Sequence, residues 1–199
     1  GDVGDALRVL PFLERFPGAR LVSFHGTDLS DRWDAAAYQP LWPRSDFFLC
    51  RSESLRQLLL AKGCPAERIR LNFTGVPVPE SVSPRKLPAW RSGASVRLLQ
   101  VCRFMPKKGL DVTLHAVSRL KAHGVALHLT LAGDGPDLPR LTALVNELGL
   151  QGEVTFAGFL STNALERLYI EHDLFVHPSR PTASGDREGI PNSLLEAMS

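Results

Sequence analysis

The sequence predicts an α/β fold in which two parallel β-sheets are each covered by helices. Short apolar runs of strand length alternate with longer amphipathic segments along most of the chain. A proline-rich stretch interrupts this alternation before the middle of the chain and separates two such sheets. The composition agrees, since 44% hydrophobic and 22% charged residues in a chain of 199 are ordinary for a protein that builds a packed core.

The first half contains strand-length apolar segments and one clear helix. Residues 52–63 begin with Ser52, which can cap a helix, and end with Gly63, which is typical of a helix terminus. Residues 68–73 alternate polar and apolar side chains, as in a strand with one face in water. The strand-like segments of this half are residues 19–24, 46–50 and 68–73.

Residues 77–94 form a predicted linker between two domains. They carry prolines at positions 77, 79, 84 and 88 and show no helical or strand period, which is typical of a domain boundary. We therefore expect a partial N-terminal domain over residues 1–76 and a second domain, truncated at its end, over residues 95–199. Because the chain starts at Gly1 and stops at Ser199 inside an apparent helix, we expect a fragment of a longer protein.

The second half alternates strand and helix more regularly. Residues 108–122 are predicted to form a helix with one apolar side, and residues 138–148 a helix closed by Gly149. The apolar side of the first helix contains Leu110, Leu114, Val117 and Leu120. The other predicted elements are strands at 95–101, 126–133, 153–158 and 173–178, a helix at 162–169, and a last helix from Pro191. This spacing is typical of a parallel sheet with helices on both faces.

Charge and cysteine content exclude several classes of protein. A formal net charge of +2 is too small to indicate a nucleic-acid or membrane partner by itself. Three cysteines without a CxxC pair predict neither a disulfide framework nor a structural zinc site, and they fit a reducing cytoplasm. No apolar run approaches the roughly 18 residues that a membrane-spanning helix needs.

Basic residues and glycines follow the predicted strands of the second half, and open parallel sheets bind ligands beyond the carboxyl ends of their strands. Arg103 and Lys108 flank a turn into a helix, where cations can neutralise a diphosphate. Two exposed charges that aid solubility would have the same spacing. Gly133 and Asp134 lie in a Gly-Asp-Gly-Pro turn, where a glycine would let a ligand approach the backbone. Phe159 follows the next strand.

The stretch REGIPNSLLEAM near the end of the chain places two glutamates around the start of a helix. Pro191 suits the first helical position, so the amides of Asn192 and Ser193 would point outward and meet an anion. Glu188 precedes the helix and Glu196 lies within it, and carboxylates accept the paired hydrogen bonds that sugar hydroxyls donate. The alternative is that both glutamates are solvated charges, with Glu188 favoured by the helix dipole.

His25 follows a strand of the first half and is a candidate for a role in chemistry. It could hydrogen-bond a substrate or act as a base, whereas the nearby Asp28 could equally cap the next helix. Four other histidines lack the spacing of metal ligands and are interpreted as structural. They are His115, His123, His128 and His172.

In order and spacing, these motifs resemble those of retaining glycosyltransferases of family 4, which have the two-domain GT-B fold. The resemblance covers essentially the whole chain and implies two Rossmann-like parallel-sheet domains that face a cleft, the first of them partial. It rests on CRFMPKKGLD, LAGDGP, VTFAGFLS, LFVHPSR and EGIPNSLLEAM in the second half, and on SFHGTD and SESLRQLLLAKGCPAERIRL in the first. Cys102 departs from the family's usual glycine, and we expect the family's N-terminal glycine-rich loop and C-terminal crossing helix to be missing.

The resemblance implies roles in donor binding. Arg103 and Lys108 would hold the nucleotide diphosphate, and Glu188 would contact hydroxyls of the donor sugar. Glu196 would accept hydrogen bonds from the nucleotide ribose, and backbone amides from Ile190 to Ser193 would meet the donor.

Other positions complete the implied site. Gly133, Asp134 and Phe159 are assigned to the donor, in turns at the edge of the second sheet. His25 would lie near the reacting sugar, where it and Asp28 would shape the acceptor side.

The resulting hypothesis is a hexosyltransferase that moves a hexosyl group from a UDP- or GDP-sugar to a hydroxyl with retention, without a bound metal or other cofactor. The acceptor would be a sugar or a lipid-linked sugar in bacterial polysaccharide or glycolipid biosynthesis. The location would be the cytoplasm, with a peripheral contact at the inner face of the plasma membrane, and no nucleic-acid partner is expected. Leu7, Leu10 and Leu13 could form a helix face for that contact, although this pattern is more often core.

Two alternatives stay open on the sequence. The first is a nucleotide-sugar binding fragment without activity. The second is a glycoside hydrolase that uses Glu188 and Glu196 as acid and base, which would give Arg103 and Lys108 no role.

Overall fold

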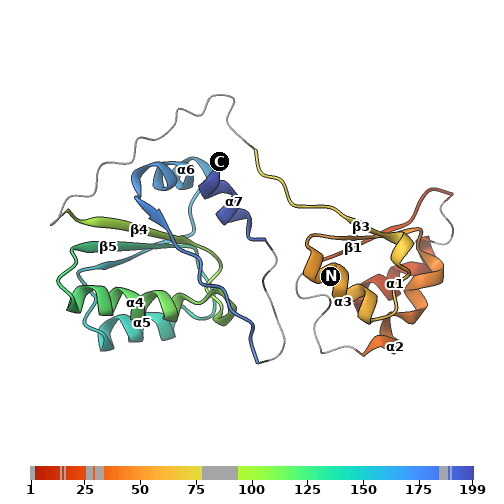
Figure 1. Ribbon diagram of the computed structural model, residues 1–199, viewed down its shortest axis with the longest axis horizontal. Helices are drawn as coiled ribbons and strands as arrows, with labels where there is room; N and C mark the ends of the chain where they lie inside the picture. The colour runs from red at the N-terminus through yellow and green to blue at the C-terminus, as the bar shows by residue number, and fades with distance from the viewer. Residues whose placement is uncertain are drawn as a thin grey trace. The chain divides into compact units, whose positions relative to one another are not determined.

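The computed structural model describes residues 3–13, 15, 17–25, 29, 34–77, 94–183, 188 and 190–199. It divides into two compact units (Figure 1). The first unit contains Gly1–Gly75 together with Pro181–Pro191, and the second contains Val76–Arg180 together with Asn192–Ser199. Each unit holds one parallel β-sheet, so the predicted α/β class is confirmed. Most of the predicted linker, residues 78–93, lies outside the described residues, and the domain boundaries stay a prediction.

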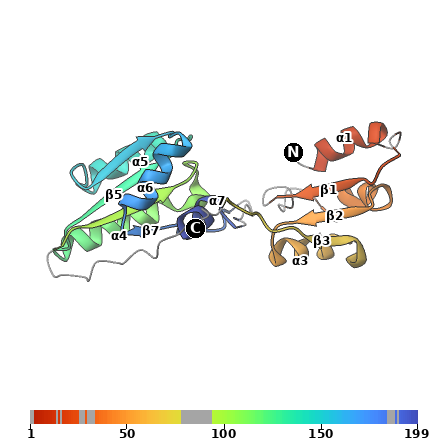
Figure 2. The same ribbon diagram turned by 90° about the horizontal axis from the view of Figure 1, so that it is seen from above.

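The sheet of the first unit contains three parallel strands in the order β1-β2-β3, side by side in Figure 2. Leu21 pairs with Phe47, and Phe48 pairs with Ile69. Each parallel neighbour requires a crossover connection, and helical segments supply it. The elements are α1 (Val3–Leu13), β1 (Leu21–Phe24), α2 (Ala35–Tyr38), the 3₁₀ helix η1 (Gln39–Arg44), β2 (Phe47–Cys50), α3 (Glu53–Ala61), the 3₁₀ helix η2 (Ala66–Arg68) and β3 (Ile69–Leu71).

Side-chain caps define where two of these helices begin. The Ser52 hydroxyl accepts a hydrogen bond from the Leu55 amide at 3.2 Å, as the sequence pattern of α3 predicted. Asp34 does the same for α2, where its carboxylate accepts from the Ala37 amide at 3.0 Å. Both caps satisfy an amide that has no partner inside the helix, and they set the start of each crossover.

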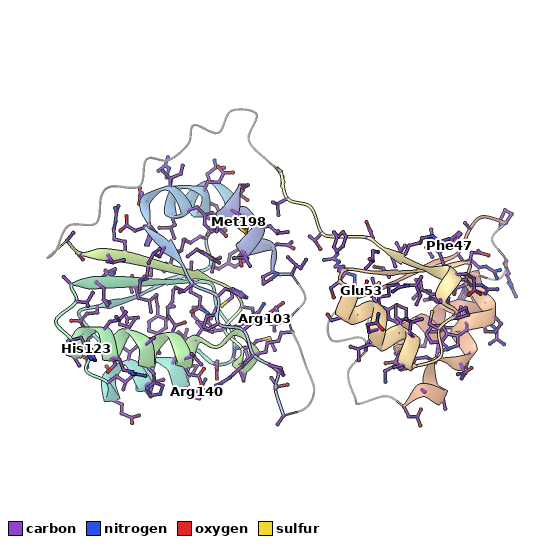
Figure 3. All side chains as sticks on the ribbon, viewed as in Figure 1. Phe47, Glu53, Arg103, His123, Arg140 and Met198 are labelled. Atoms are coloured by element: carbon purple, nitrogen blue, oxygen red, sulfur yellow. The ribbon has the colours of Figure 1, made fainter. Side chains whose placement is uncertain are left out.

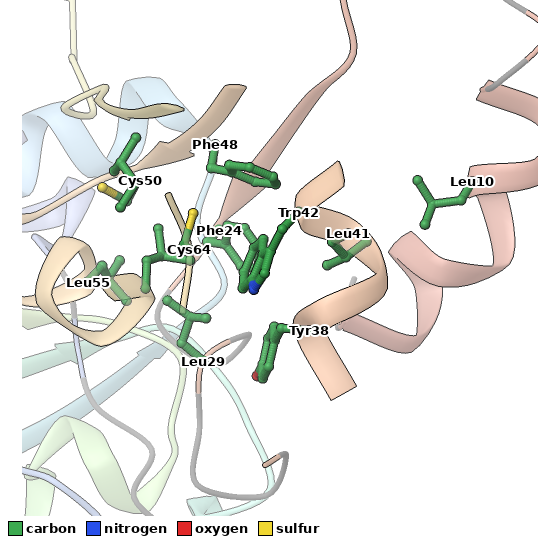
Figure 4. Close-up of a cluster of buried hydrophobic side chains, with 12 residues drawn as sticks. Leu10, Phe24, Leu29, Tyr38, Leu41, Trp42, Phe48, Cys50, Leu55 and Cys64 are labelled. Carbon is green, nitrogen blue, oxygen red and sulfur yellow. The ribbon is translucent and has the colours of Figure 1, made fainter. Parts of the chain in front are cut away.

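Aromatic side chains form the core of the first unit (Figure 4). The rings of Tyr38 and Trp42 are stacked, and Phe48 meets Trp42 edge-on with the ring centroids 4.9 Å apart. Leu10 of α1 joins this cluster and is only 4% exposed, and Leu7 packs against it. The apolar spacing in α1 is therefore core at these two positions, which was the commoner interpretation of the pattern. The side chain of Leu13 lies outside the described residues.

The second unit contains four parallel strands in the order β6-β5-β4-β7. Figure 1 shows α4 and α5 on one face of this sheet and α6 on the other. The core lies between β4, β5 and the helices α4 and α5. The elements are β4 (Val96–Val101), the 3₁₀ helix η3 (Pro106–Lys108), α4 (Leu110–Ala122), β5 (Leu127–Ala132), α5 (Leu138–Glu147), β6 (Val154–Gly158), α6 (Thr162–Glu171), β7 (Leu174–Phe175) and α7 (Asn192–Met198).

Some boundaries differ from the sequence prediction. Lys108 does not begin the long helix but ends η3, because Gly109 adopts a left-handed conformation with φ 67° between the two helices. Leu120 is 41% exposed, so the buried side of α4 is narrower than its apolar spacing predicted. The last helix begins at Asn192, one residue after Pro191. Among the described residues, no helix combines the length and apolar character needed to cross a bilayer.

Candidate functional site

The strand order of the second unit places a topological switch point between β4 and β7. The chain leaves β4 toward β5 and β6 on one side and later returns to β7 on the other side. In open parallel sheets, ligands bind beyond the carboxyl ends of the strands at such a point, because the connecting helices lie on opposite faces and leave a crevice. A ligand site is therefore expected at the residues that follow β4 and β7.

The carboxyl ends of β4, β5 and β6 coincide. Val101 pairs with Ala132, and Ala132 pairs with Gly158. Figure 3 shows Arg103 at this end of the second unit and His123, at the end of α4, at the opposite end. The structure thus brings together the turns that carry Arg103, Gly133 and Phe159, as the sequence predicted from strand ends.

Arg103 projects from a turn whose backbone is anchored on both sides. The Cys102 amide donates to the Ala132 carbonyl at 3.1 Å, and the Phe104 amide donates to the Asp134 carbonyl at 2.8 Å. The Phe104 side chain is fully buried and meets Phe156 edge-on. Arg103 itself is exposed, and within the described ranges no carboxylate forms an ion pair with it. An exposed guanidinium on an anchored backbone is available for an anion from outside the protein.

Gly133 is required by its contact with the Arg103 turn. With φ 131°, a Cβ at this position would overlap the carbonyl oxygen of Cys102, so only glycine lets the two backbones approach. Asp134 turns its carboxylate back to the chain and accepts from the Gly135 amide at 2.7 Å. Packing of one loop on another accounts for these residues without a ligand, which favours the turn interpretation that the sequence left beside donor binding.

A buried pair of polar side chains fixes the turn that carries Lys108. Gln100 is fully buried, and its amide nitrogen donates to the Lys108 carbonyl at 3.0 Å. The Thr113 hydroxyl donates to the Gln100 side-chain oxygen at 2.7 Å, inside the core. On the other side, the Arg180 amide donates to the Lys107 carbonyl at 2.9 Å. The turn is therefore held from β4, from α4 and from the loop after β7.

Gly109 lets the loop after β7 approach the Lys108 turn closely. A Cβ on Gly109 would overlap the carbonyl oxygen of Pro178, and the left-handed backbone at this position also favours glycine. The contact joins the residues after β4 to those after β7, across the switch point. The sequence pattern did not predict Gln100 or Thr113 as parts of the site, since nothing in a strand or a helix identifies which polar residue faces a distant loop.

Other arginines near this edge are tied to carboxylates. The Arg180 guanidinium donates to Asp111. Arg140 makes a paired contact with Asp137 at 2.7 and 2.8 Å, and its hydrogen bond holds the pKa of Asp137 below the usual range. These ion pairs link α4, α5 and the loop after β7, so they are structural. The contrast with Arg103 identifies which arginine of this edge can serve a ligand.

Glu196 lies on α7 and is held by a tyrosine of α6. The Tyr169 hydroxyl donates to Oε2 of Glu196 at 2.9 Å. Burial, together with this hydrogen bond, raises the pKa of Tyr169. The Tyr169 ring also lies beside Phe175 of β7, with centroids 5.8 Å apart. Sequence reasoning missed Tyr169, and the only indication available was its position on the helix that precedes β7.

Phe159 is a conspicuous apolar residue at the edge of the sheet. It follows β6 directly, and 89% of its surface is exposed. A phenylalanine exposed to this degree leaves apolar surface in water, which is unfavourable in free energy, and it contributes little to the core. Its ring face is therefore available to a planar ligand group.

The remaining predicted residues of this motif divide between the two units. Asn192 and Ser193 open α7 in the second unit, exposed and half-buried respectively. Glu188, Ile190 and Pro191 belong to the segment that groups with the first unit. The structure therefore brings Arg103, Lys108 and Glu196 into one unit, whereas Glu188 groups with the other. Gly189 lies outside the described residues.

His25 follows β1 in the first unit and is exposed, with its Nε2 3.5 Å from the Ser23 hydroxyl. Asp28 lies outside the described residues. Of the histidines interpreted as structural, His172 is buried between the Leu168 carbonyl and the Thr130 hydroxyl. His128 meets the Thr155 hydroxyl, His123 meets a backbone carbonyl, and His115 is exposed. Within the described part of the chain, no three His, Cys, Asp or Glu residues form a group that could hold a metal ion.

Comparisons with known proteins cover both halves of the chain. Residues 91–199 match the family described as glycosyl transferases group 1. A putative colanic acid biosynthesis glycosyltransferase of Escherichia coli is 36% identical over 180 residues, which are 88% of this chain and 43% of that protein. An amylovoran biosynthesis glycosyltransferase of Erwinia amylovora is 33% identical over 202 residues, covering 100% of this chain and 48% of that protein. The chain thus spans less than half the length of these curated relatives.

The fold also matches solved structures. The crystal structure of Anabaena HepE in complex with UDP superposes with a TM-score of 0.73, at 20% identity, over 98% of this chain and 54% of that chain. Its match over 98% of this chain, and a match to a solved galactosyltransferase, confirm the predicted GT-B type of fold.

Proposed function

The chain belongs to the glycosyl transferases group 1 family, and from this we propose that the protein is a retaining hexosyltransferase of family 4. It takes a hexosyl group from a UDP- or GDP-sugar and transfers it to a hydroxyl of a sugar or lipid-linked sugar. Relatives named for colanic acid and amylovoran biosynthesis support a place in bacterial polysaccharide or glycolipid formation. A solved neighbour with bound UDP supports the nucleotide donor.

One observation carries this proposal: Arg103 is an exposed cation at the switch point, on an anchored turn, while the arginines around it are ion-paired. A rigid guanidinium binds two oxygens of a diphosphate at once. Lys108 adds a second cation from the turn that Gln100 holds. Two cations neutralise the charge that develops on the departing diphosphate, which is the main catalytic effect expected in a site without a metal.

The other predicted residues complete the proposed donor site. Glu196 accepts from the ribose, and Glu188 orients the donor sugar. The exposed ring of Phe159 offers a face to the nucleotide base. His25, which follows β1 in the first unit, serves the acceptor side. The amides from Ile190 to Ser193 contact the donor.

We place this activity in the cytoplasm, where nucleotide sugars would be supplied, with a peripheral contact at the inner face of the plasma membrane. The outer side of α1 supports that contact. Its Phe12 is 68% exposed, Val9 is also exposed, and Arg8 lies beside them. Apolar and basic residues on one helix side are the combination that binds an anionic membrane surface.

The test is nucleotide binding and turnover in the full-length enzyme, by calorimetry with UDP and GDP and by transfer assays with the corresponding sugars. Arg103→Ala removes charge-assisted hydrogen bonds of about 1.5–3 kcal/mol, so it should weaken nucleotide binding about 10- to 150-fold. Lys108→Ala should lower turnover sharply. Arg119→Ala is the matched control, because Arg119 is also an exposed arginine but lies in the last turn of α4, whereas Arg103 and Lys108 precede the first turn of that helix.

Three results would reject the proposal. Unchanged binding in Arg103→Ala would remove the diphosphate role, and nucleotide binding without transfer would leave only a binding module. Hydrolysis of simple glycosides without nucleotide would favour the hydrolase alternative, in which Glu188 and Glu196 act as acid and base.

A further inference from the structure

The hydrogen bond between Tyr169 and Glu196 joins two elements that are far apart in the sequence. It spans 27 residues and connects α6 to α7 at 2.9 Å. The tyrosine is held at its other end as well, because its ring lies beside Phe175, which in turn stacks on His177 at a centroid distance of 6.2 Å. The hydroxyl that reaches Glu196 is therefore fixed by the side chains of β7 and the loop that follows it.

The geometry leaves most of the hydrogen-bonding capacity of the Glu196 carboxylate for a ligand. Tyr169 donates to Oε2, and among the described residues no side chain donates to Oε1. A carboxylate has about four acceptor positions, so one tyrosine hydroxyl occupies a minor part of its capacity. Vicinal hydroxyls, such as those of a ribose, donate two parallel hydrogen bonds and fit the remainder.

An unanchored glutamate on this helix would be poorly ordered. The helix α7 contains seven residues, none of them buried. A glutamate side chain has several rotatable bonds, and ordering them on ligand binding costs affinity. Tyr169 orders them in advance. Because burial raises its pKa, the hydroxyl keeps its proton and stays a donor over the whole range in which an enzyme works.

We propose that Tyr169 is a positioning residue that presents the Glu196 carboxylate to the ribose hydroxyls of the nucleotide donor. This inference rests on the proposed function, since it assigns the ribose to Glu196. It adds the tyrosine that no sequence motif identified, and it predicts that discrimination between ribose and deoxyribose depends on a residue that does not touch the nucleotide.

The experiment compares nucleotide pairs in the full-length enzyme by calorimetry. UDP and 2′,3′-dideoxy-UDP are used, or the guanosine pair if GDP is the nucleotide that binds. The wild type should prefer the ribonucleotide. Tyr169→Phe keeps the ring against Phe175 and removes only the hydroxyl, and it should reduce this preference about fivefold, the worth of one hydrogen bond. The KM for the donor should rise by a similar factor while kcat stays unchanged.

Two further variants isolate the effect. Glu196→Gln should reduce the preference more, and the double variant should be no worse than Glu196→Gln alone, because the tyrosine acts only through that carboxylate. Tyr38→Phe is the matched control, since Tyr38 is the chain's other tyrosine and lies in the core of the first unit. It should leave the preference intact.

Spectroscopy supplies a readout that does not need turnover. With tyrosine labelled by ¹³C at Cζ, the signal lost in Tyr169→Phe identifies Tyr169. That signal should shift in Glu196→Gln and again when the ribonucleotide binds, and it should respond less to the dideoxy analogue.

The outcomes separate the inference from the proposed function. A wild type that binds neither UDP nor GDP overturns both. Binding with a ribose preference that Glu196→Gln abolishes and Tyr169→Phe leaves intact overturns the inference alone. An equal loss for ribo- and dideoxynucleotides in Tyr169→Phe also overturns it, because the tyrosine would then only dock α7.

Discussion

The buried pair Gln100 and Thr113 supports a quantitative prediction about the Lys108 turn. Thr113→Val keeps the shape of the side chain but removes the hydroxyl that donates to Gln100 at 2.7 Å. The Gln100 side-chain oxygen is then buried without that donor, while the bond from its nitrogen to the Lys108 carbonyl remains. We expect the free energy of unfolding of the second unit to fall by about 1–3 kcal/mol, the cost of one unsatisfied buried polar group.

Gln100→Leu is the complementary change, because it removes both the acceptor for Thr113 and the donor to Lys108. It should destabilise the unit and also raise the KM for the nucleotide donor, whereas Thr113→Val should leave that KM unchanged. In the double variant the Thr113–Gln100 bond loses both partners, so its cost should fall short of the sum of the single costs by about 0.5–3 kcal/mol.

Hydrogen exchange detected by mass spectrometry is the appropriate assay. The three tryptophans lie at positions 33, 42 and 90, so intrinsic fluorescence does not report the sheet that starts at Val96. The slowest amides of β4 and α4 should exchange roughly 5- to 150-fold faster in Thr113→Val, which is the fold-change that corresponds to 1–3 kcal/mol. Amides of β2 in the first unit serve as the internal control.

Two results would refute the reasoning. Unchanged exchange in Thr113→Val would show that the buried hydrogen bond carries no stability. A wild-type KM in Gln100→Leu would show that the bond to the Lys108 carbonyl does not place the lysine.

Two further predictions concern backbone and thiol chemistry. Gly149→Ala should lower the free energy of unfolding by about 1–2 kcal/mol, since φ is 64° and no atom lies within 4 Å of the added Cβ. Gly109→Ala should lower it clearly more and also reduce nucleotide affinity, because its Cβ overlaps the Pro178 carbonyl. Equal losses of stability by hydrogen exchange would contradict this. Burial raises the pKa of Cys64 to about 12, so its thiol should resist iodoacetamide at pH 9 until the first unit unfolds. The unfolded thiol loses its proton at its ordinary, lower pKa, so the stability contributed by the buried, protonated Cys64 should be complete below that pKa and decline as the pH rises toward 12. Rapid alkylation of the native protein would argue against this burial.

Part of the fold followed directly from local sequence patterns. The strands β4, β5 and β6 lie where apolar runs of strand length predicted them, and Ser52 caps α3 as its position before the helix indicated. The segment of α2 and η1 was not predicted, since Pro40 and Pro43 argue against a regular helix and a 3₁₀ helix accommodates them.

The candidate site was predictable to the extent that it depends on strand ends. A strand's last residue is visible in the sequence, and parallel strands end at the same edge, so Arg103, Gly133 and Phe159 could be grouped in advance. The reason for Gly133 was not visible, because its close contact with Cys102 depends on how two loops pack.

The sequence by itself determined which segments become strands and helices, and which charged residues lie near the end of a strand. Periods of 2 and 3.6 residues and helix caps act over a few residues, so they can be recognised without the fold. Only the tertiary structure decided that Tyr169 holds Glu196 and that Gln100 holds the Lys108 turn from inside the core. It also decided that Arg103 stays unpaired among the described residues while Arg180 and Arg140 are neutralised. These contacts depend on strand order and helix faces, which bring distant segments within hydrogen-bond distance and leave no local pattern in the chain.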